Sequence, residues 1–235
     1  MRMISNAFQK IRQIDDVLSK INDGCTLMAG GFGGVGTPPT LVDAILEKGV
    51  RDLEIICNDA GFPHIGIGRI VSSGRVRKLI ASHIGSNPIA GALMSEGKLH
   101  VEFSPQGTLA ERIRAGGMGL GGILCDVGIG SEIAEKGKER LTVNGKTYLL
   151  ETALTADVAI ICGRKADEFG NIVYEKSARN MNPLMAMAGD YTIAEVDQIV
   201  GSGELDPETI ITPGVFVQAI VQSEGVNWKW VWEPK

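Results

Sequence analysis

The residues with the clearest chemical potential form a glycine run near the N-terminus, Gly30-Gly31-Phe32-Gly33-Gly34-Val35-Gly36. Its last six residues have the G-x-G-x-x-G spacing of loops that bind the pyrophosphate of nicotinamide or flavin dinucleotides. In such sites the third glycine lies within the first turns of the following helix. Here Thr37-Pro38-Pro39 follows at once, and proline disfavours helical geometry in the residue before it. We therefore expect a long, mobile backbone arch rather than a tight dinucleotide turn.

Such an arch would present backbone N–H groups and a helix N-terminus to an anion or a developing oxyanion. We expect Thr37 to cap that helix, Pro38 to be its first residue, and Gly49 to end it after about residue 47. Two other interpretations remain open. One is a nicotinamide-dependent oxidoreductase whose cofactor binds at Gly31–Gly36, and the other is a purely structural glycine loop.

Alternating apolar segments and helical patterns predict an α/β fold with an open, mostly parallel sheet flanked by helices. Strands are expected at residues 25–29, 53–57, 78–82, 99–104, 157–162, 172–174 and 191–196. Helices are expected over about 8–21, 38–47 and 109–115, the last opened by Thr108 and Glu111 at capping-box spacing. Asn144-Gly145 predicts an antiparallel hairpin extension at 140–150. Since neither a repeat nor a linker is apparent, residues 1–235 are expected to form one domain.

The composition narrows the classes of partner. With 23 basic and 28 acidic side chains the net charge is −5, which disfavours a nucleic-acid binder because phosphates require a basic face. No run of 18 apolar residues appears, so no membrane association is expected. Four widely spaced cysteines without a C-x-x-C pair are typical of a reduced, cytoplasmic protein. Three histidines without carboxylates at ligand spacing argue against a metal site.

Residues 23–38 match, position by position, the signature of family I coenzyme A transferases. The resemblance continues through Asn58-Asp59, Ala81–Pro88, Ser104–Gly117 and Ser177–Pro183. The resemblance covers about residues 14–221. Within the family, the sequence is most similar to the alpha subunit of the acetate/butyrate–acetoacetate, or 3-oxoacid, type. The sequence departs from that pattern at Cys125–Ser131, where T-P-T-G-x-G-T is common, and at Met181, where Phe is common.

The resemblance implies an enzyme that moves coenzyme A between a short-chain acyl-CoA and a free acid, acetoacetate with acetate or butyrate. Coenzyme A is then a substrate, with no permanently bound cofactor. A glutamate attacks the thioester, and the reaction passes through a glutamyl-CoA thioester. In the family this glutamate belongs to a separate beta subunit, in an S-E-N-G context, and this chain has no Glu-Asn pair. We therefore expect it to be inactive alone and to need that partner, in a heterodimer or heterotetramer.

The resemblance also implies roles for individual residues. It places Gly30 to Gly36 at the loop that binds CoA and the acyl group through backbone donors. It places Gln106 near the substrate carboxylate, where its amide can donate a hydrogen bond. The alternative for Gln106 is a turn residue before the helix at Thr108. A non-catalytic acyl-CoA-binding module remains a further alternative for the whole chain.

Other polar residues are weaker candidates. Asn58-Asp59 ends a strand on the side expected for the glycine run. Arg112 and Arg114 point in different directions on a helix, so at least one is expected in a structural ion pair or in solvent; a contact with CoA phosphates remains open. Asn180 and Asn182 are expected to fix loops through backbone hydrogen bonds.

All the tryptophan of the chain lies in its C-terminal tail, at Trp228, Trp230 and Trp232. The alternating spacing predicts that the three side chains share one face of an extended segment. Docking onto the body of the chain and contact with a partner are both consistent with this pattern.

Overall fold

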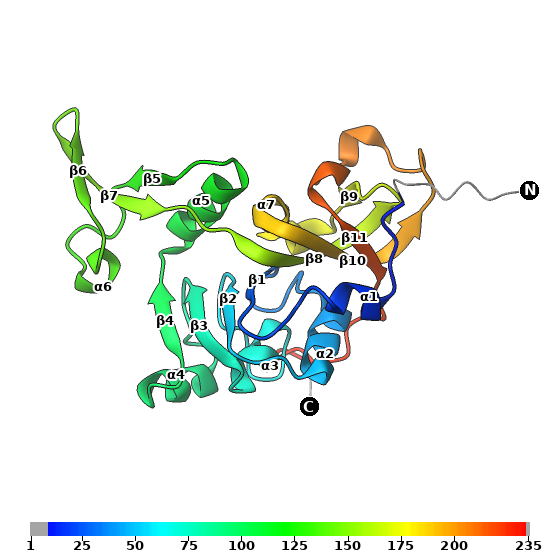
Figure 1. Cartoon of the computed structure of the whole chain (residues 1–235), viewed down its shortest axis with the longest axis horizontal. Helices are drawn as coiled ribbons and strands as arrows, with labels where there is room; N and C mark the ends of the chain where they lie inside the picture. Colours follow the sequence, from blue (N-terminus) through cyan, green and yellow to red (C-terminus); the bar gives the residue numbers. More distant parts are fainter. Residues whose placement is uncertain (1–8, 234–235) are drawn as a thin grey trace, which may run out of the picture.

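A computed structural model describes residues 9–233. Its larger sheet contains eight strands: β1 (Thr26–Ala29), β2 (Leu53–Ile56), β3 (Val76–Ala81), β4 (His100–Phe103), β8 (Ala156–Asp167), β9 (Ile172–Val173), β10 (Gly189–Val200) and β11 (Ala219–Gln222). They follow the order β11-β10-β8-β1-β2-β3-β4, with β9 beside β8 (Figure 1). All neighbours in this order are parallel, and only β9 is antiparallel. The mostly parallel sheet predicted from the sequence is confirmed.

Helices cover both faces of this sheet. They are α1 (Ile14–Leu18), α2 (Pro39–Lys48), α3 (Ile67–Ser72), α4 (Pro88–Ser95), α5 (Gln106–Gly117) and α7 (Asn182–Ala188). Side chains alternate along each strand, so Leu27 joins the core under α1–α4 and Met28 joins the core under α5 and α7. Short 3₁₀ turns, η1 (Lys176–Arg179), η2 (Pro207–Thr209) and η3 (Gly214–Phe216), lie in the connections.

A smaller antiparallel sheet projects from the body beyond α5 (Figure 1). It consists of β5 (Gly122–Cys125), β7 (Lys146–Thr152) and β6 (Arg140–Val143), and α6 (Glu132–Glu135) lies in the β5–β6 connection. Asn144 and Gly145 have φ angles of 52° and 77°, the left-handed geometry of a two-residue hairpin. The predicted hairpin is therefore confirmed. We call residues 118–152 the extension.

Several helix boundaries differ from prediction. Only Ile14–Leu18 of the expected helix at 8–21 is helical, and residue 8 lies outside the described part of the chain. Pro38 caps α2 and Pro39 is its first residue, so the assignment of the cap to Thr37 was wrong, whereas Gly49 does end the helix. The helix expected at 109–115 is α5, which begins at Gln106, so Thr108 and Glu111 form no capping box.

Six further helices and strands, β5, β11, α3, α4, α6 and α7, have no clear signal in the sequence, and all are eight residues long or shorter. Their apolar periodicity extends over too few residues to be distinguished from a loop. Within residues 9–233 no helix has the length and apolarity that crossing a membrane requires.

Candidate functional site

The glycine run folds into a closed turn. Phe32 N–H donates to Val35 O at 2.9 Å, and Val35 N–H donates back to Phe32 O at 3.1 Å. Gly33 and Gly34 between them have φ angles of 58° and 95°, which glycine adopts without steric cost. The expected long arch was wrong in its shape, because two consecutive glycines allow the chain to reverse within two residues. We call residues 30–36 the glycine turn.

Two asparagines hold the glycine turn from a distant part of the chain. Asn180 accepts the Gly31 N–H at 3.2 Å and donates to Val35 O at 2.8 Å. Asn182 donates to Gly36 O at 3.0 Å. The prediction that both asparagines fix a loop through backbone hydrogen bonds is confirmed, and that loop is the glycine turn.

Asp59 holds the same turn from the next strand. Its Oδ2 accepts the Gly33 N–H at 2.9 Å, and its Oδ1 accepts the Gly61 N–H at 2.8 Å. The Asn58 side chain donates to Asp59 Oδ2 at 2.8 Å. The structure therefore brings Asn58-Asp59 to the glycine turn, where both side chains are buried and act on protein groups.

The tryptophan tail packs on the glycine turn. A Cβ at Gly34 would lie 2.5 Å from Ile65 and 3.0 Å from the Trp230 ring, so both side chains press on this residue. Trp228 and Trp230 are perpendicular at 5.9 Å, whereas Trp230 and Trp232 stack at 4.9 Å. The three rings thus do not share one face of a straight segment, and the tail docks on the body of the chain.

A second turn of the same kind follows β2. Residues 61–66 read G-F-P-H-I-G, and Ile65 N–H donates to Phe62 O at 3.1 Å. Both turns follow adjacent parallel strands, at the edge where open α/β sheets bind ligands. The sequence carries a signal for this repeat, because G-F-x-x-[V/I]-G recurs after the next strand, but reasoning from the glycine run alone missed it.

The glycine turn offers fewer free donors than expected. Within residues 9–233, five of its seven N–H groups already have acceptors, namely those of Gly30, Gly31, Phe32, Gly33 and Val35. The N–H groups of Gly34 and Gly36 have no acceptor in that part of the chain. Gly36 is partly exposed, whereas Gly34 is buried against Ile65 and Trp230, so the Gly36 amide is the more accessible of these two donors, beside the half-exposed Phe32 ring.

The N-terminus of α2, which follows the glycine turn, is occupied by a carboxylate of the chain itself. Glu195, fully buried on β10, accepts the N–H groups of Thr40 at 3.1 Å and Leu41 at 2.9 Å. It also accepts the hydroxyls of Thr40 at 2.8 Å and Ser223 at 2.5 Å. Burial raises the pKa of Glu195 above its ordinary value, and these four hydrogen bonds oppose the rise. The expectation that this helix end faces an anionic ligand was therefore wrong.

Replacing Glu195 with alanine is expected to destabilise the chain by about 2–4 kcal/mol, because several buried donors lose their acceptor together. Urea unfolding at pH 7 measures this difference. Asp197→Ala on the same strand is the matched control, since its exposed pair with Arg164 is expected to contribute at most about 1 kcal/mol. Equal losses in the two variants would contradict the assigned role of Glu195.

Gln106 is the first residue of α5 rather than a residue of the preceding turn. Its side chain is exposed, and its Nε2 lies 3.9 Å from the sulfur of Met181. Met181 is buried between Asn180 and Asn182, which bind the glycine turn. Residues 180–182 thus contact both the glycine turn and Gln106, the two parts of the candidate site.

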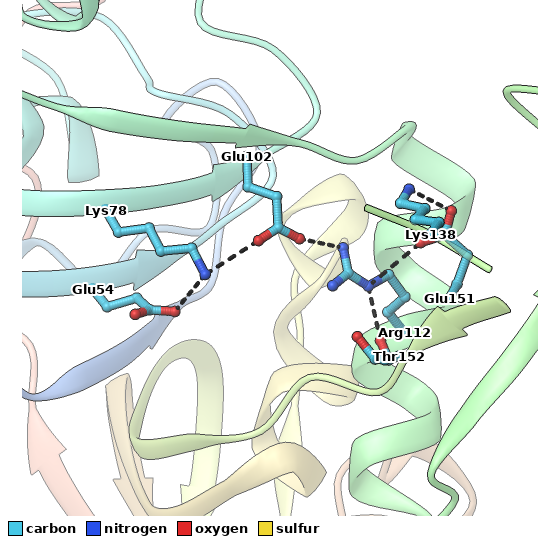
Figure 2. A network of polar contacts seen from close by, with 7 residues as sticks. All are labelled: Glu54, Lys78, Glu102, Arg112, Lys138, Glu151 and Thr152. Carbon is cyan, nitrogen blue, oxygen red and sulfur yellow. Dashed lines mark hydrogen bonds and ion pairs between the residues drawn. The ribbon is translucent and has the colours of Figure 1, made fainter. Parts of the chain in front are cut away.

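Arg112 lies further along α5 and joins the two sheets (Figure 2). Its side chain is only 5% exposed. The guanidinium donates to Glu102 of β4 at 2.9 Å and to Thr152 O of β7 at 2.8 Å, and its Nε lies 3.8 Å from the Glu151 carboxylate. This geometry assigns Arg112 to a structural ion network rather than to CoA phosphates.

The network extends in both directions (Figure 2). Lys78 lies 3.1 Å from Glu102 and 3.2 Å from Glu54, and Lys138 lies 2.6 Å from Glu151. Arg114 instead forms a partly exposed pair with Glu111 at 2.8 Å. Within residues 9–233 no three His, Cys, Asp or Glu side chains form a group that could hold a metal ion.

Comparison with known proteins shows close relatives along nearly the whole chain. The chain is 62% identical over 226 residues to the alpha subunit of a probable coenzyme A transferase of Bacillus subtilis, covering 96% of this chain and 99% of the relative. It is 50% identical to the alpha subunit of the acetate CoA-transferase of Escherichia coli, over 92% and 97% of the two chains. It is 48% identical to the acetoacetyl-CoA:acetate/butyrate CoA transferase alpha subunit of Clostridium acetobutylicum, over 91% and 97%.

Solved structures share the fold. An acyl-CoA transferase of Escherichia coli O157:H7, YdiF, superposes with a TM-score of 0.82 at 23% identity, over 95% of this chain and 48% of that one. This chain therefore spans about half the length of YdiF. Glutaconate coenzyme A-transferase of Acidaminococcus fermentans superposes with a TM-score of 0.79 at 21% identity, over 91% and 75%.

The sequence also matches the model of a protein family. The family model described as coenzyme A transferase matches residues 11–223, which include the glycine turn, Gln106 and both asparagines. Together with the 62% identity to the alpha chain from Bacillus subtilis, this match shows that the protein belongs to the coenzyme A transferase family.

Proposed function

We propose that this chain is the alpha subunit of an enzyme that exchanges coenzyme A between acetoacetate and acetate or butyrate. The observation that carries the proposal is the glycine turn, in which two N–H groups have no acceptor within residues 9–233, linked through Met181 to Gln106. The names of relatives that are 50% and 48% identical support these acids. Relatives named for succinyl-CoA with 3-ketoacids or for 3-oxoadipate are 50% and 45% identical, so a panel of acids is the direct test of specificity.

The proposed reaction needs a companion, the beta chain of the enzyme, because this chain lacks the Ser-Glu-Asn-Gly context. The companion's glutamate attacks the thioester carbonyl, and the CoA thiolate leaves to give a mixed anhydride. The thiolate then attacks the glutamyl carbonyl, which releases the carboxylate and forms the glutamyl-CoA thioester. An incoming carboxylate reverses both steps and leaves as the new acyl-CoA.

This chain would contribute neutral hydrogen-bond donors to that reaction. Each attack places negative charge on a carbonyl oxygen, and preorganised donors stabilise such an oxyanion. The N–H groups of Gly34 and Gly36 and the amide of Gln106 can do this without any change of protonation. Coenzyme A takes part in this reaction as a substrate, and the proposed reaction needs no resident cofactor.

The alternative of a nicotinamide-dependent oxidoreductase is disfavoured by the same geometry. A dinucleotide pyrophosphate binds at the helix N-terminus after the glycine loop. Here that helix begins at Pro39, and the Glu195 carboxylate already accepts its N–H groups. A non-catalytic acyl-CoA-binding module would bind acyl-CoA but show no exchange in the assembled complex.

Gln106→Ala is expected to lower kcat of the assembled enzyme by about 10²–10³-fold, the effect of removing one oxyanion donor. Assembly with the companion should remain intact, because the Gln106 side chain is exposed. Acyl-CoA exchange kinetics on the co-purified complex measure the change, with the exposed Gln198→Ala as the matched control. Unchanged kinetics would remove Gln106 from the site, and exchange by the isolated chain would contradict the proposed function.

A further inference from the structure

The extension has an unusually apolar surface. Seven of the fifteen exposed large apolar side chains in the described part of the chain lie between Met118 and Val143. The most exposed are Ile133 at 68%, Met118 at 59% and Val127 at 50%. A folded chain that works alone rarely exposes apolar side chains in such density, because water disfavours apolar surface. We call this set, within residues 118–143, the apolar surface of the extension.

Several charged residues of the same extension are paired with one another. Lys146 pairs with Asp126, and Arg140 pairs with Glu135. Protein–protein interfaces combine a core of apolar side chains with a polar rim, and the extension supplies residues of both kinds. The extension also projects away from the larger sheet, where a second protein can reach it (Figure 1).

The extension begins beside the candidate site. Cys125, the last residue of β5, has its sulfur 3.5 Å from the hydroxyl of Thr108. Thr108 lies in the first turn of α5, two residues after Gln106. A protein that covers the apolar surface next to Cys125 therefore approaches the start of α5, where Gln106 is exposed.

We propose that the apolar surface of the extension docks the companion chain. This inference rests on the proposed function, which requires a companion whose glutamate reaches Gln106 and the glycine turn. A second copy of this chain would not complete the site, because it lacks that glutamate context as well. YdiF, in which this chain matches only 48% of the length, combines this fold with a further portion in one chain, as expected if the fold works together with a second unit.

Photo-crosslinking of the assembled complex tests the location directly. The photoreactive residue p-benzoylphenylalanine is placed at position 127 or 133 of this chain, which is then co-expressed with the companion. Both positions are expected to crosslink to the companion. Position 215 in η3 is the control, because Val215 is 75% exposed but lies outside the extension. Crosslinks only between copies of this chain, or none at 127 and 133, would overturn the proposal.

A charge in the docked surface tests its contribution. Ile133→Asp is expected to weaken association with the companion on the order of tenfold or more, since an unpaired charge would be buried there. Val215→Asp should leave association unchanged. Sedimentation measures the affinity, and the melting curve of each isolated variant shows that it is folded. Equal affinities for the two variants would overturn the proposal.

The two proposals fail separately. A complex that crosslinks at 127 and 133 but exchanges no coenzyme A supports the docking surface and contradicts the proposed function. An active complex that gives no crosslink at either position overturns the docking surface alone.

Discussion

Gly30→Ala is expected to lower kcat/KM of the assembled transferase at least about 100-fold, because the glycine turn, which we propose as a donor site for the reaction, would be displaced from its position. An alanine Cβ here would lie 1.8 Å from Asn182 Oδ1, far inside van der Waals contact. Asn182 must then move, although it accepts the Cys162 N–H at 2.9 Å and donates to Gly36 O at 3.0 Å. The overpacking alone is expected to cost about 1–3 kcal/mol of stability.

The control for this variant is Gly91→Ala in α4, where an added Cβ meets nothing within 4 Å. Alanine favours a helix over glycine, so this variant should be neutral or slightly more stable. Exchange kinetics on the complex and urea unfolding of each chain separate a displaced turn from a globally unstable one. Retention of full activity in Gly30→Ala would show that the Asn182 contact does not set the position of the glycine turn.

This part of the site shows where reasoning from the sequence ends. Short apolar runs predict β1, β2, β3, β8 and β10, because buried parallel strands are apolar on both faces. Alternation between apolar and polar residues predicts β4, which lies at the edge of the sheet. Gly49 and Asn144-Gly145 are predictable because each acts through its own φ angle. These signals are local, and tertiary contacts do not alter them.

The errors concern groups whose partners are distant in the sequence. The glycine turn is closed by its own hydrogen bonds and held by Asn180 and Asn182, about 150 residues away. The N-terminus of α2 has no free anion site because the Glu195 carboxylate already accepts its N–H groups. Glu195 lies on β10, a strand much later in the sequence. Nothing in the spacing of either segment indicates which residue it meets. The start of α5 is mispredicted for the opposite reason: Thr108 has the local pattern of a capping box, although it is buried inside the helix that Gln106 begins.

Arg112→Met is expected to destabilise the chain by about 3–5 kcal/mol at pH 7, the usual loss when one partner of a buried ion pair is removed. Glu151 is 1% exposed, and without Arg112 the only cation paired with it in the described part of the chain is Lys138. Methionine fills a similar volume, so the loss reports the missing charge and hydrogen bonds rather than a cavity. Urea unfolding measures the difference. Arg114→Met, which breaks only the partly exposed pair with Glu111, should lose at most about 1 kcal/mol.

The pH dependence distinguishes the ion network from simple packing. Burial disfavours the charge of Glu102, but the hydrogen bonds and charges of Arg112 and Lys78 outweigh it and hold the pKa of Glu102 below its ordinary value. A lowered folded-state pKa stabilises the fold above about pH 4.3, and this stability is lost as the pH falls through the folded-state pKa. As the pH is lowered from 7 through the folded-state pKa of Glu102, the free energy of unfolding should therefore fall less in Arg112→Met than in the native chain. If the free energy of unfolding changes with pH in the same way in both proteins, Arg112 acts through packing rather than through its charge. The ion network would then not be what holds α5, and Gln106 at its start, between the two sheets.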